Sequence, residues 1–360
     1  MADAARRPVL LTVSGRIPDD LDDQIAAGSR PRADYRLMQH AFDADIVDQD
    51  VALAASGRVG SIIRRIAGVG ALLGWYCFRH RHRYEVIVTD GEQVGLPFEI
   101  LSKFGRRGAR HMMITHILSV PKKVRLVRFT RIARAIDCYV VYCSWQADFL
   151  HTRLGVDSDR VLLSTFMVDT DFFSPDTVDV PRRKMICSAG LERRDYPTLI
   201  SAVDGLDVDV VIAAASPWSK RSDSTADVAI PDNVSVQAFD LFQLRSLYAQ
   251  SLFVVMPLED VDFQAGITTI LEAMSMARPV LCTMTPGQRD TVIDGETGVY
   301  VEGGDADALR AALIQLLDDP ERCDELGRNA REWTVREADI SIYAERLAER
   351  VRSLRHTTPN

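Results

Sequence analysis

Gln264 and Glu272 stand eight positions apart, and the residues between them are types that can hold an anion. The run Ala265-Gly266-Ile267-Thr268 is small enough to bring backbone N–H groups close to a phosphate. The next stretch, TILEAMSMA, predicts a helix whose N-terminal dipole would favour the same negative charge. Glu272 lies within that helix, where a carboxylate repels phosphate but can accept hydrogen bonds from ribose hydroxyls. From these residues alone, an ordinary surface glutamate remains an equally good interpretation.

Gly68, Gly70 and Gly74 form a second glycine pattern, loosely similar to the phosphate loop of dinucleotide-binding proteins. That loop must follow a strand directly, whereas the preceding GRVGSIIRRIA predicts a helix. No acidic residue follows at the spacing that would bind the ribose of NAD. An NAD enzyme is therefore a disfavoured alternative.

Short, continuously apolar runs rich in β-branched residues alternate with helical stretches along the chain. Such runs are typical of parallel strands buried on both faces, and the alternation predicts an α/β fold with doubly wound sheets. The expected strands cover residues 9–14, 84–90, 111–116, 138–144, 185–190, 208–214, 234–239, 253–258, 279–284 and 298–302.

The strand series breaks at residues 169–184, which hold two prolines and several acids and show no helical period. We interpret this segment as a linker between two Rossmann-like domains that face a central cleft. The expected domains are residues 1–178 and 179–335, followed by a C-terminal helix at 336–360 that packs back on the first domain.

The charge of the chain is unevenly distributed. The net charge of −8 argues against a nucleic-acid partner. Residues 58–134, however, hold 16 basic and 4 acidic side chains, a net +12. Arginines recur every third residue from 125 to 134 and predict a basic amphipathic helix over 121–137. The basic region 58–134 predicts an anionic partner, either an acidic lipid surface or a phosphate-bearing acceptor.

Membrane and redox signals point to a cytoplasmic chain, with or without membrane association. The longest apolar run, residues 66–78, is shorter than the roughly 20 residues that span a bilayer. A buried helix is the favoured interpretation of this run, and a helix that dips into a membrane interface is the alternative. Six scattered cysteines without a C-x-x-C pair exclude a disulfide scaffold and the usual zinc ribbons.

The segment around Glu272 resembles the signature of the family 4 glycosyltransferases (glycosyl transferases group 1), which are retaining enzymes of the GT-B fold. That signature is a Glu, seven residues, a second Glu, then Ala-Met and a small-Pro-Val strand. The chain carries it as Gln264-AGITTIL-Glu272-Ala-Met, followed by ARPV. Other stretches similar to the family are STFMVDTDFFSP (164–175), SAGLERRDYPTLISAV (188–203) and TPGQRDTVIDGETGVYVEGGDADAL (285–309).

The resemblance implies a hexosyltransferase that takes a nucleotide-diphosphate sugar, a UDP- or GDP-sugar, as co-substrate and needs no metal. The second domain would hold this donor, with Glu272 on the ribose and residues 265–268 on the diphosphate or sugar. Arg193 and Arg194 are the cations available for the diphosphate, because Leu191 occupies the position of the family's Arg. The base would pack near the segment Phe239, Asp240 and Leu241.

The resemblance also assigns roles in the first domain. His116 ends an expected strand where the family places a His that faces the donor sugar. Gly15, after the first strand, is similar to the glycine loop that approaches the diphosphate. Glu92 ends another strand and is expected near the acceptor.

Gln264 departs from the family, whose first signature residue is Glu. Glutamine can still hydrogen-bond a sugar hydroxyl but carries no charge, so we expect it to tune the donor sugar or its geometry. The alternative is a GT-B-fold protein that binds a nucleotide sugar without transferring it. Two acceptors also remain open, a membrane-linked glycan or lipid and a small soluble molecule.

Overall fold

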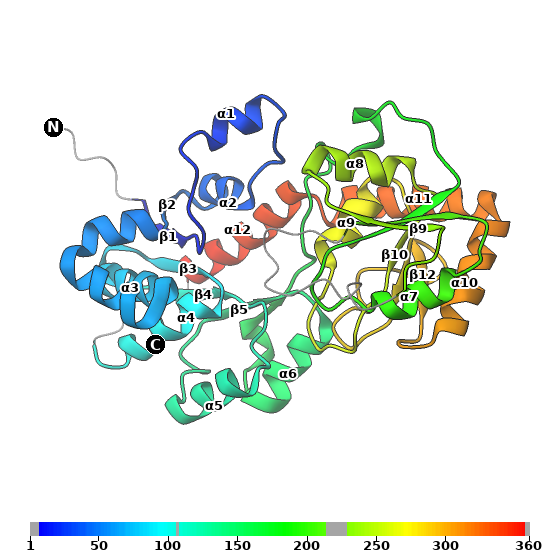
Figure 1. The fold of residues 1–360 in the computed structure, drawn as a ribbon. Helices are drawn as coiled ribbons and strands as arrows, with labels where there is room; N and C mark the ends of the chain where they lie inside the picture. The colour runs from blue at the N-terminus through cyan, green and yellow to red at the C-terminus, as the bar shows by residue number, and fades with distance from the viewer. Residues whose placement is uncertain (1–6, 106–107, 214–228, 357–360) are drawn as a thin grey trace. The chain divides into compact units, whose positions relative to one another are not determined.

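A computed structural model describes residues 7–105, 108–213 and 229–356 (Figure 1). The chain divides into two units, residues 1–164 with 341–360 and residues 165–340. This division falls before the expected boundary at 178/179, because Phe172 and Phe173 are buried in the core of the second unit. Each unit is built on one parallel sheet of six strands, as expected for a doubly wound α/β fold.

The first sheet has the strand order β2-β1-β3-β4-β5-β6, and every neighbouring pair is parallel. β2 lies on one side of β1, and β3 lies on the other side. The carboxyl ends of β1 and β3 therefore mark a topological switch point of the sheet. The sequence missed β2 and β6, which are short strands at the two edges of this sheet. The strands are β1 (Val9–Thr12), β2 (Ala44–Val47), β3 (Val86–Asp90), β4 (Arg110–Ile114), β5 (Cys138–Val141) and β6 (Val161–Leu163).

Helices of the first unit include the last helix of the chain, α12. Its Tyr343 hydroxyl lies 2.9 Å from that of Tyr142, and both rings are buried. Leu347 and Val351 of α12 are also buried. The helices are α1 (Leu21–Ala26), α2 (Asp34–Phe42), α3 (Gln49–His80), α4 (Glu92–Ser102), α5 (Pro121–Thr130), α6 (Ser144–Leu154) and α12 (Ile340–His356).

The glycine pattern of residues 68–74 lies inside α3, so the strand required for a dinucleotide loop is missing. Gly70 and Gly74 instead allow close packing, because a Cβ at Gly70 would lie 2.3 Å from the Gln93 carbonyl oxygen of α4. This placement contradicts the NAD alternative. In the part of the chain that the structure describes, no helix is long and apolar enough to cross a bilayer.

The basic helix of the first unit is shorter than predicted. α5 ends at Thr130, because Arg131 takes a left-handed conformation with φ 55°. Ile132 and Ile136 then turn inward and are fully buried. The repeating pattern of residues 121–137 therefore covers one helix, α5, and the buried loop that follows it.

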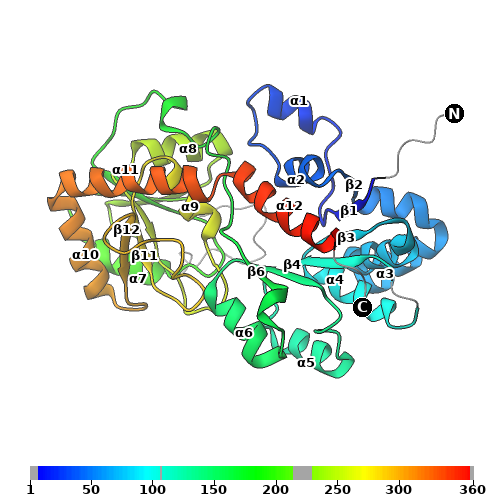
Figure 2. The same cartoon turned by 180° about the vertical axis from the view of Figure 1, so that it is seen from behind.

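The second sheet has the strand order β12-β11-β10-β7-β8-β9, again parallel throughout, with its switch point between β7 and β10. The buried side chains of α8 and α9 pack on one face of this sheet, and those of α7 and α10 on the other. Figure 2 shows α9, α10 and α11 from behind. The strands are β7 (Met185–Ala189), β8 (Asp209–Ala213), β9 (Val234–Gln237), β10 (Val254–Met256), β11 (Val280–Thr283) and β12 (Gly298–Val301). The helices are α7 (Tyr196–Val203), α8 (Leu241–Gln250), α9 (Ile267–Ser275), α10 (Ala306–Asp318) and α11 (Pro320–Glu337).

Candidate functional site

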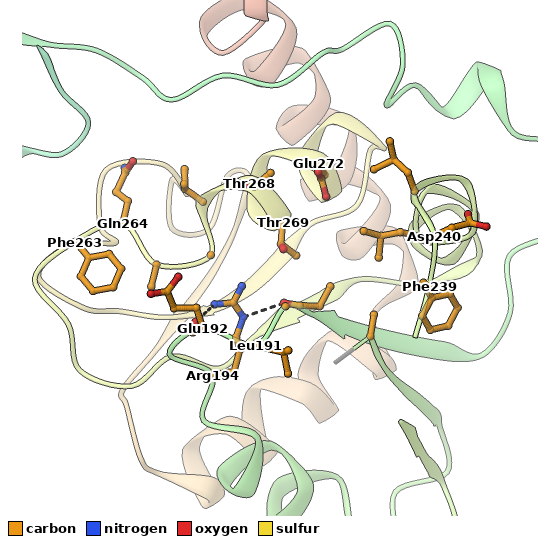
Figure 3. Close-up of a pocket in the computed structure, with 18 residues that line it drawn as sticks. Leu191, Glu192, Arg194, Phe239, Asp240, Phe263, Gln264, Thr268, Thr269 and Glu272 are labelled. Atoms are coloured by element: carbon orange, nitrogen blue, oxygen red, sulfur yellow. Dashed lines mark hydrogen bonds between the residues drawn. The ribbon is translucent and has the colours of Figure 1, made fainter. Parts of the chain in front are cut away.

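A cavity of about 530 Å³ lies within the second unit, beside its switch point. The loops that follow β7 and β10 both line it, as expected where two neighbouring loops of a parallel sheet diverge. A cavity of this volume suits a small ligand or cofactor. The lining residues, drawn in Figure 3, are Ala189, Gly190, Leu191, Glu192, Arg194, Ala213, Phe239, Asp240, Leu241, Leu244, Phe263, Gln264, Ala265, Gly266, Ile267, Thr268, Thr269 and Glu272.

The side chains that could recognise a ligand follow one another along this cavity. Gln264 lies at one end, and Phe239 and Asp240 lie at the other (Figure 3). Arg194 and Glu272 lie between the two ends. The fold thus gathers most of the residues that the sequence assigns to the donor, from segments 23 residues or more apart in the chain.

The loop before α9 approaches the cavity closely. Gly266 is the N-cap of α9 and has a left-handed conformation with φ 75°, which favours glycine. A Cβ at this position would lie 2.7 Å from the Met256 sulfur and 3.1 Å from Nη2 of Arg194. The first N–H groups of a helix have no partner within it, so the N-terminus of α9 presents partial positive charge beside the cavity.

Arg194 places a buried cation at the cavity. Its side chain donates from Nε to the carbonyl of Ala189 at 2.9 Å and from Nη1 to that of Glu192 at 2.6 Å. A Cβ at Gly190, where φ is 93°, would lie 2.6 Å from Nη2 of Arg194. Burial lowers the pKa of Arg194, but a guanidinium remains protonated at neutral pH. Arg194 can therefore bind an anion in the cavity.

Arg193 does not line the cavity. Its backbone is left-handed, with φ 58°, and its side chain forms an ion pair with Glu259 at 2.9 Å. Both side chains of this pair are more than a third exposed. The sequence assigned two arginines to the diphosphate, but the structure brings only Arg194 to the cavity.

Glu272 lies in α9, is almost fully buried and lines the cavity. Its carboxylate accepts a hydrogen bond from the Tyr248 hydroxyl at 3.0 Å. Burial raises the pKa of Glu272 to about 7, although the bond from Tyr248 opposes this shift. The carboxylate therefore has capacity for further donors, and a ligand hydroxyl in the cavity can supply one.

A segment after β11 braces the loop that carries Gln264. Gln288 is fully buried and donates from Nε2 to the Ala265 carbonyl at 3.1 Å. Gly287 packs so closely that a Cβ would lie 2.2 Å from the Phe263 carbonyl oxygen. Nε2 of Gln264 donates to the Thr291 hydroxyl at 3.3 Å. Among the described residues, Oε1 of Gln264 accepts no hydrogen bond.

The segment expected to hold a base begins α8 at the far end of the cavity. The Asp240 side chain accepts from the backbone N–H of Gln243 at 2.8 Å and caps the helix. This contact engages the Asp240 carboxylate in holding α8. Phe239 is partly buried, so its ring is the group of this segment best suited to stack against a planar ligand.

His116 follows β4 in the first unit. Its Nε2 lies 3.6 Å from a carboxylate oxygen of Asp90, and its ring stacks on Tyr142. Burial lowers the pKa of His116, but the hydrogen bond and charge of Asp90, with Glu92 and Asp34, outweigh burial and raise it. The side chain is 40% exposed, which leaves the ring accessible to a substrate.

Glu92 is buried at the start of α4. Its carboxylate accepts from the backbone N–H groups of His116 and Ile117 and from Nζ of Lys123 at 2.5 Å. Glu92 therefore holds the loop that carries His116, and its contact with an acceptor stays a prediction. Gly15 is exposed, and its approach to a diphosphate stays a prediction.

Sequence reasoning missed Tyr248, Gln288 and Thr291 as supports of the cavity. Tyr248 lies 24 residues before Glu272, and no spacing rule connects the two. Gln288 and Thr291 fall in the stretch 285–309 that resembles the family. The sequence shows that Gln288 and Thr291 are polar residues close to a glycine, Gly287. Only the fold shows that they support the loop that carries Gln264.

The two parallel six-stranded units are those of a GT-B fold, and solved structures support this assignment. Sucrose-phosphate synthase from Thermosynechococcus elongatus superposes with a TM-score of 0.73 and 17% identity over 97% of this chain and 99% of that chain. Anabaena Alr3699/HepE in complex with UDP-glucose gives a TM-score of 0.68 at 14% identity over 96% and 99% of the two chains.

Residues 178–333 match the family model described as glycosyl transferases group 1. The match covers less than half of the chain and lies in its second unit, so the second unit is similar to this family. It is 28% identical over 204 residues to the GDP-mannose-dependent alpha-(1-6)-phosphatidylinositol monomannoside mannosyltransferase of Mycolicibacterium smegmatis, covering 51% of this chain and 53% of that protein. It is 26% identical over 239 residues to the D-inositol 3-phosphate glycosyltransferase of Gordonia bronchialis, covering 58% and 51%. The chain thus spans about half the length of these curated relatives.

Proposed function

We propose that this protein is a retaining glycosyltransferase of family 4, which moves a sugar from a GDP- or UDP-sugar to a hydroxyl group. The order of side chains along the cavity carries this proposal. Gln264, Arg194 with the N-terminus of α9, Glu272 and Phe239 succeed one another along the cavity. A nucleotide sugar presents its sugar, diphosphate, ribose and base in the same order.

The positive groups of the cavity suit the departure of a nucleoside diphosphate. Arg194 and the N-terminus of α9 stabilise the negative charge that develops as the bond from the sugar to the diphosphate breaks. The bond from the acceptor oxygen to the sugar forms on the same face, and the acceptor proton passes to a phosphate oxygen of the leaving group. This route needs no carboxylate nucleophile, so the neutral Gln264 is compatible with it, and we propose that transfer needs no metal.

His116 is proposed to face the donor sugar, as the resemblance implies. Its raised pKa, caused by Asp90 and the neighbouring carboxylates once burial is overcome, favours a protonated ring near neutral pH. A protonated imidazole donates from both nitrogens and can bind a sugar hydroxyl or a phosphate oxygen. Gly15 is proposed to lie near the diphosphate.

We propose a membrane-linked glycan or lipid as the acceptor and the cytoplasmic side of a membrane as the location. One relative is named for its action on a phosphatidylinositol mannoside, which is a lipid. The net +12 of residues 58–134 supports contact with an anionic lipid surface. A small soluble acceptor is the second candidate, because another relative is named for inositol 3-phosphate.

The second candidate function is a binder of nucleotide sugars that transfers nothing. Gln264 favours it, because the residue is neutral and its Oε1 lacks a partner among the described residues. The two functions differ in turnover. A transferase releases free nucleoside diphosphate from a sugar nucleotide when acceptor is present, whereas a binder only shifts its melting temperature.

The experiment measures binding of UDP and GDP by calorimetric titration, followed by turnover of the sugars of whichever nucleotide binds. We expect one nucleoside diphosphate to bind and to raise the melting temperature. Glu272→Ala is expected to weaken that binding by roughly 1–3 kcal/mol, because the ribose hydroxyls lose a buried hydrogen-bond partner. Glu302→Ala, which removes an exposed carboxylate outside the cavity, is the control and should bind as the parent does. Equal affinity in the Glu272→Ala variant would contradict the ribose assignment.

A further inference from the structure

The middle of α3 exposes aliphatic side chains that a folded protein normally buries. Val59, Ile62 and Ile66 are 52%, 57% and 80% exposed. They stand at i, i+3 and i+7, which places them on one stripe of a helix. Gly60 and Ile63 lie on the neighbouring side of the helix, which packs inward, and a Cβ on Gly60 would lie 3.1 Å from a methyl group of Leu72. The helix therefore packs with one side and leaves an apolar stripe uncovered.

Two glycines separate this stretch, residues 58–67, from the rest of α3. Gly57 has φ 54° and ψ −134°, and Gly68 has φ 85° and ψ 179°, so neither is helical. A Cβ at either position would meet nothing within 4 Å, so close packing does not explain these glycines. Their backbone conformation changes the direction of the helix axis at both positions. Figure 1 shows α3 as separate helical pieces on the outside of the first unit.

The charge around the stripe has one sign. Arg58, Arg64 and Arg65 are exposed on the same helical turns. The sequence from 51 to 84 contains no Asp or Glu. An apolar stripe beside arginines matches a bilayer surface, where acyl chains take the aliphatic groups and anionic headgroups take the guanidinium groups. A second copy of the chain fits less well, because its arginines would repel these.

We propose that residues 58–67 form an interfacial helix that docks the first unit on an anionic lipid bilayer. This proposal deepens the membrane contact proposed above and names the segment that makes it. Ten residues are too few to span a bilayer, so the helix lies in the plane of the headgroups. Vesicle binding requires neither donor nor acceptor, so its failure is distinguishable from failure of the proposed transferase activity.

The test is co-sedimentation of the full chain with vesicles of phosphatidylcholine alone or of equal parts phosphatidylcholine and phosphatidylglycerol. We expect binding to the anionic vesicles only. The combined substitution Val59→Ser, Ile62→Ser and Ile66→Ser should lower the partition coefficient at least roughly tenfold, because the apolar contact is lost. The combined substitution Arg58→Gln, Arg64→Gln and Arg65→Gln should lower it by roughly fivefold for each arginine.

The matched control replaces three exposed aliphatic residues of the second unit, Ile230→Ser, Ile314→Ser and Val335→Ser. It should bind vesicles as the parent does. The proposal is overturned if the parent ignores anionic vesicles or if the variant of the stripe binds them equally well. It is also overturned if the parent runs as an oligomer in gel filtration and the stripe variant as a monomer, since a second copy would then cover the stripe.

A site-specific probe reports the position of the helix directly. All six cysteines of the chain are buried, so Ile66→Cys offers an exposed thiol for an environment-sensitive dye. Its emission should shift to the blue with anionic vesicles, whereas dye on the control variant Ile314→Cys should not respond. An unshifted emission at position 66 on bound protein would overturn the assignment to this helix.

Discussion

The Glu272 carboxylate is buried beside the position proposed for a ribose, and burial raises its pKa from 4.5 to about 7. Between these two pH values the folded protein holds a proton that the unfolded chain releases. The raised pKa of Glu272 therefore stabilises the fold at low pH. The free energy of unfolding should fall by about 3 kcal/mol in total as the pH rises from 4.5 to about 7. Glu272→Gln removes the titrating group and should flatten this loss. Denaturant unfolding of both proteins from pH 4 to pH 8 measures it, and parallel stability curves would contradict the prediction.

Gly190 allows the Arg194 guanidinium to approach the backbone. Gly190→Ala should cost about 1–2 kcal/mol of stability, because φ is 93° there. It should also displace Arg194, which lies 2.6 Å from the new Cβ, and weaken nucleotide binding roughly tenfold. Gly304→Ala is the matched control, since φ is 71° and nothing lies within 4 Å of its Cβ. Calorimetric titration should show reduced affinity only in the first variant; equal losses would place the effect in backbone strain alone.

The sequence predicted which segment lines the cavity but not where each assigned side chain lies. The signature from Gln264 to Glu272 was sufficient to place that segment at the cavity. Arg193 and Arg194 were indistinguishable in the sequence, because the positive φ that turns Arg193 toward Glu259 is a property of the folded loop. The position of Glu92 beside Lys123 was equally hidden, since the two lie 31 residues apart.

At the scale of elements, the buried strands were predictable from the sequence. The short edge strands and the end of α5 were not. Each of the ten expected strands is present, because continuous apolar runs identify strands covered on both faces. β2 contains Asp45 and β6 has three residues, so neither carries that pattern. The predicted helix over 121–137 fails at Arg131, where a left-handed residue ends α5 without a glycine to mark it.

The segment 285–291 acts as one element that supports the loop before α9. Gly287→Ala should destabilise the protein by about 2 kcal/mol, because its Cβ would meet the Phe263 carbonyl oxygen at 2.2 Å and backbone atoms yield little. The displaced loop should also lose nucleotide affinity. Gly205→Ala, with φ 72° and open space around its Cβ, is a control for glycine loss without the clash. Denaturant unfolding and nucleotide titration check both effects, and an unaltered affinity in Gly287→Ala would show that the brace does not shape the site.

At the scale of the whole chain, the two units have separate cores, but the first is completed by residues from the far end of the sequence. The expected C-terminal helix begins at Ile340 as α12, within a few residues of its predicted start. The boundary between the units was predicted less well. Prolines and acids mark residues 169–184, yet Phe172 and Phe173 already belong to the second core, and their aromatic type was the available signal.

Removal of residues 341–360 should therefore affect the two units unequally. Tyr343, Leu347, Val351 and Leu354 are buried in the first unit. At about 2 kcal/mol for each, their loss approaches the whole stability of an ordinary domain. The first unit should then exchange its amide protons rapidly. The second unit keeps all of its sheet and the residues that line its cavity, so it should still be stabilised by the nucleotide that binds the full chain. Hydrogen exchange read peptide by peptide, with and without that nucleotide, separates the two units, and Tyr343→Phe, which removes only a hydroxyl, should leave both protected. Loss of the nucleotide response in the truncated chain would mean that the second unit does not fold without the first.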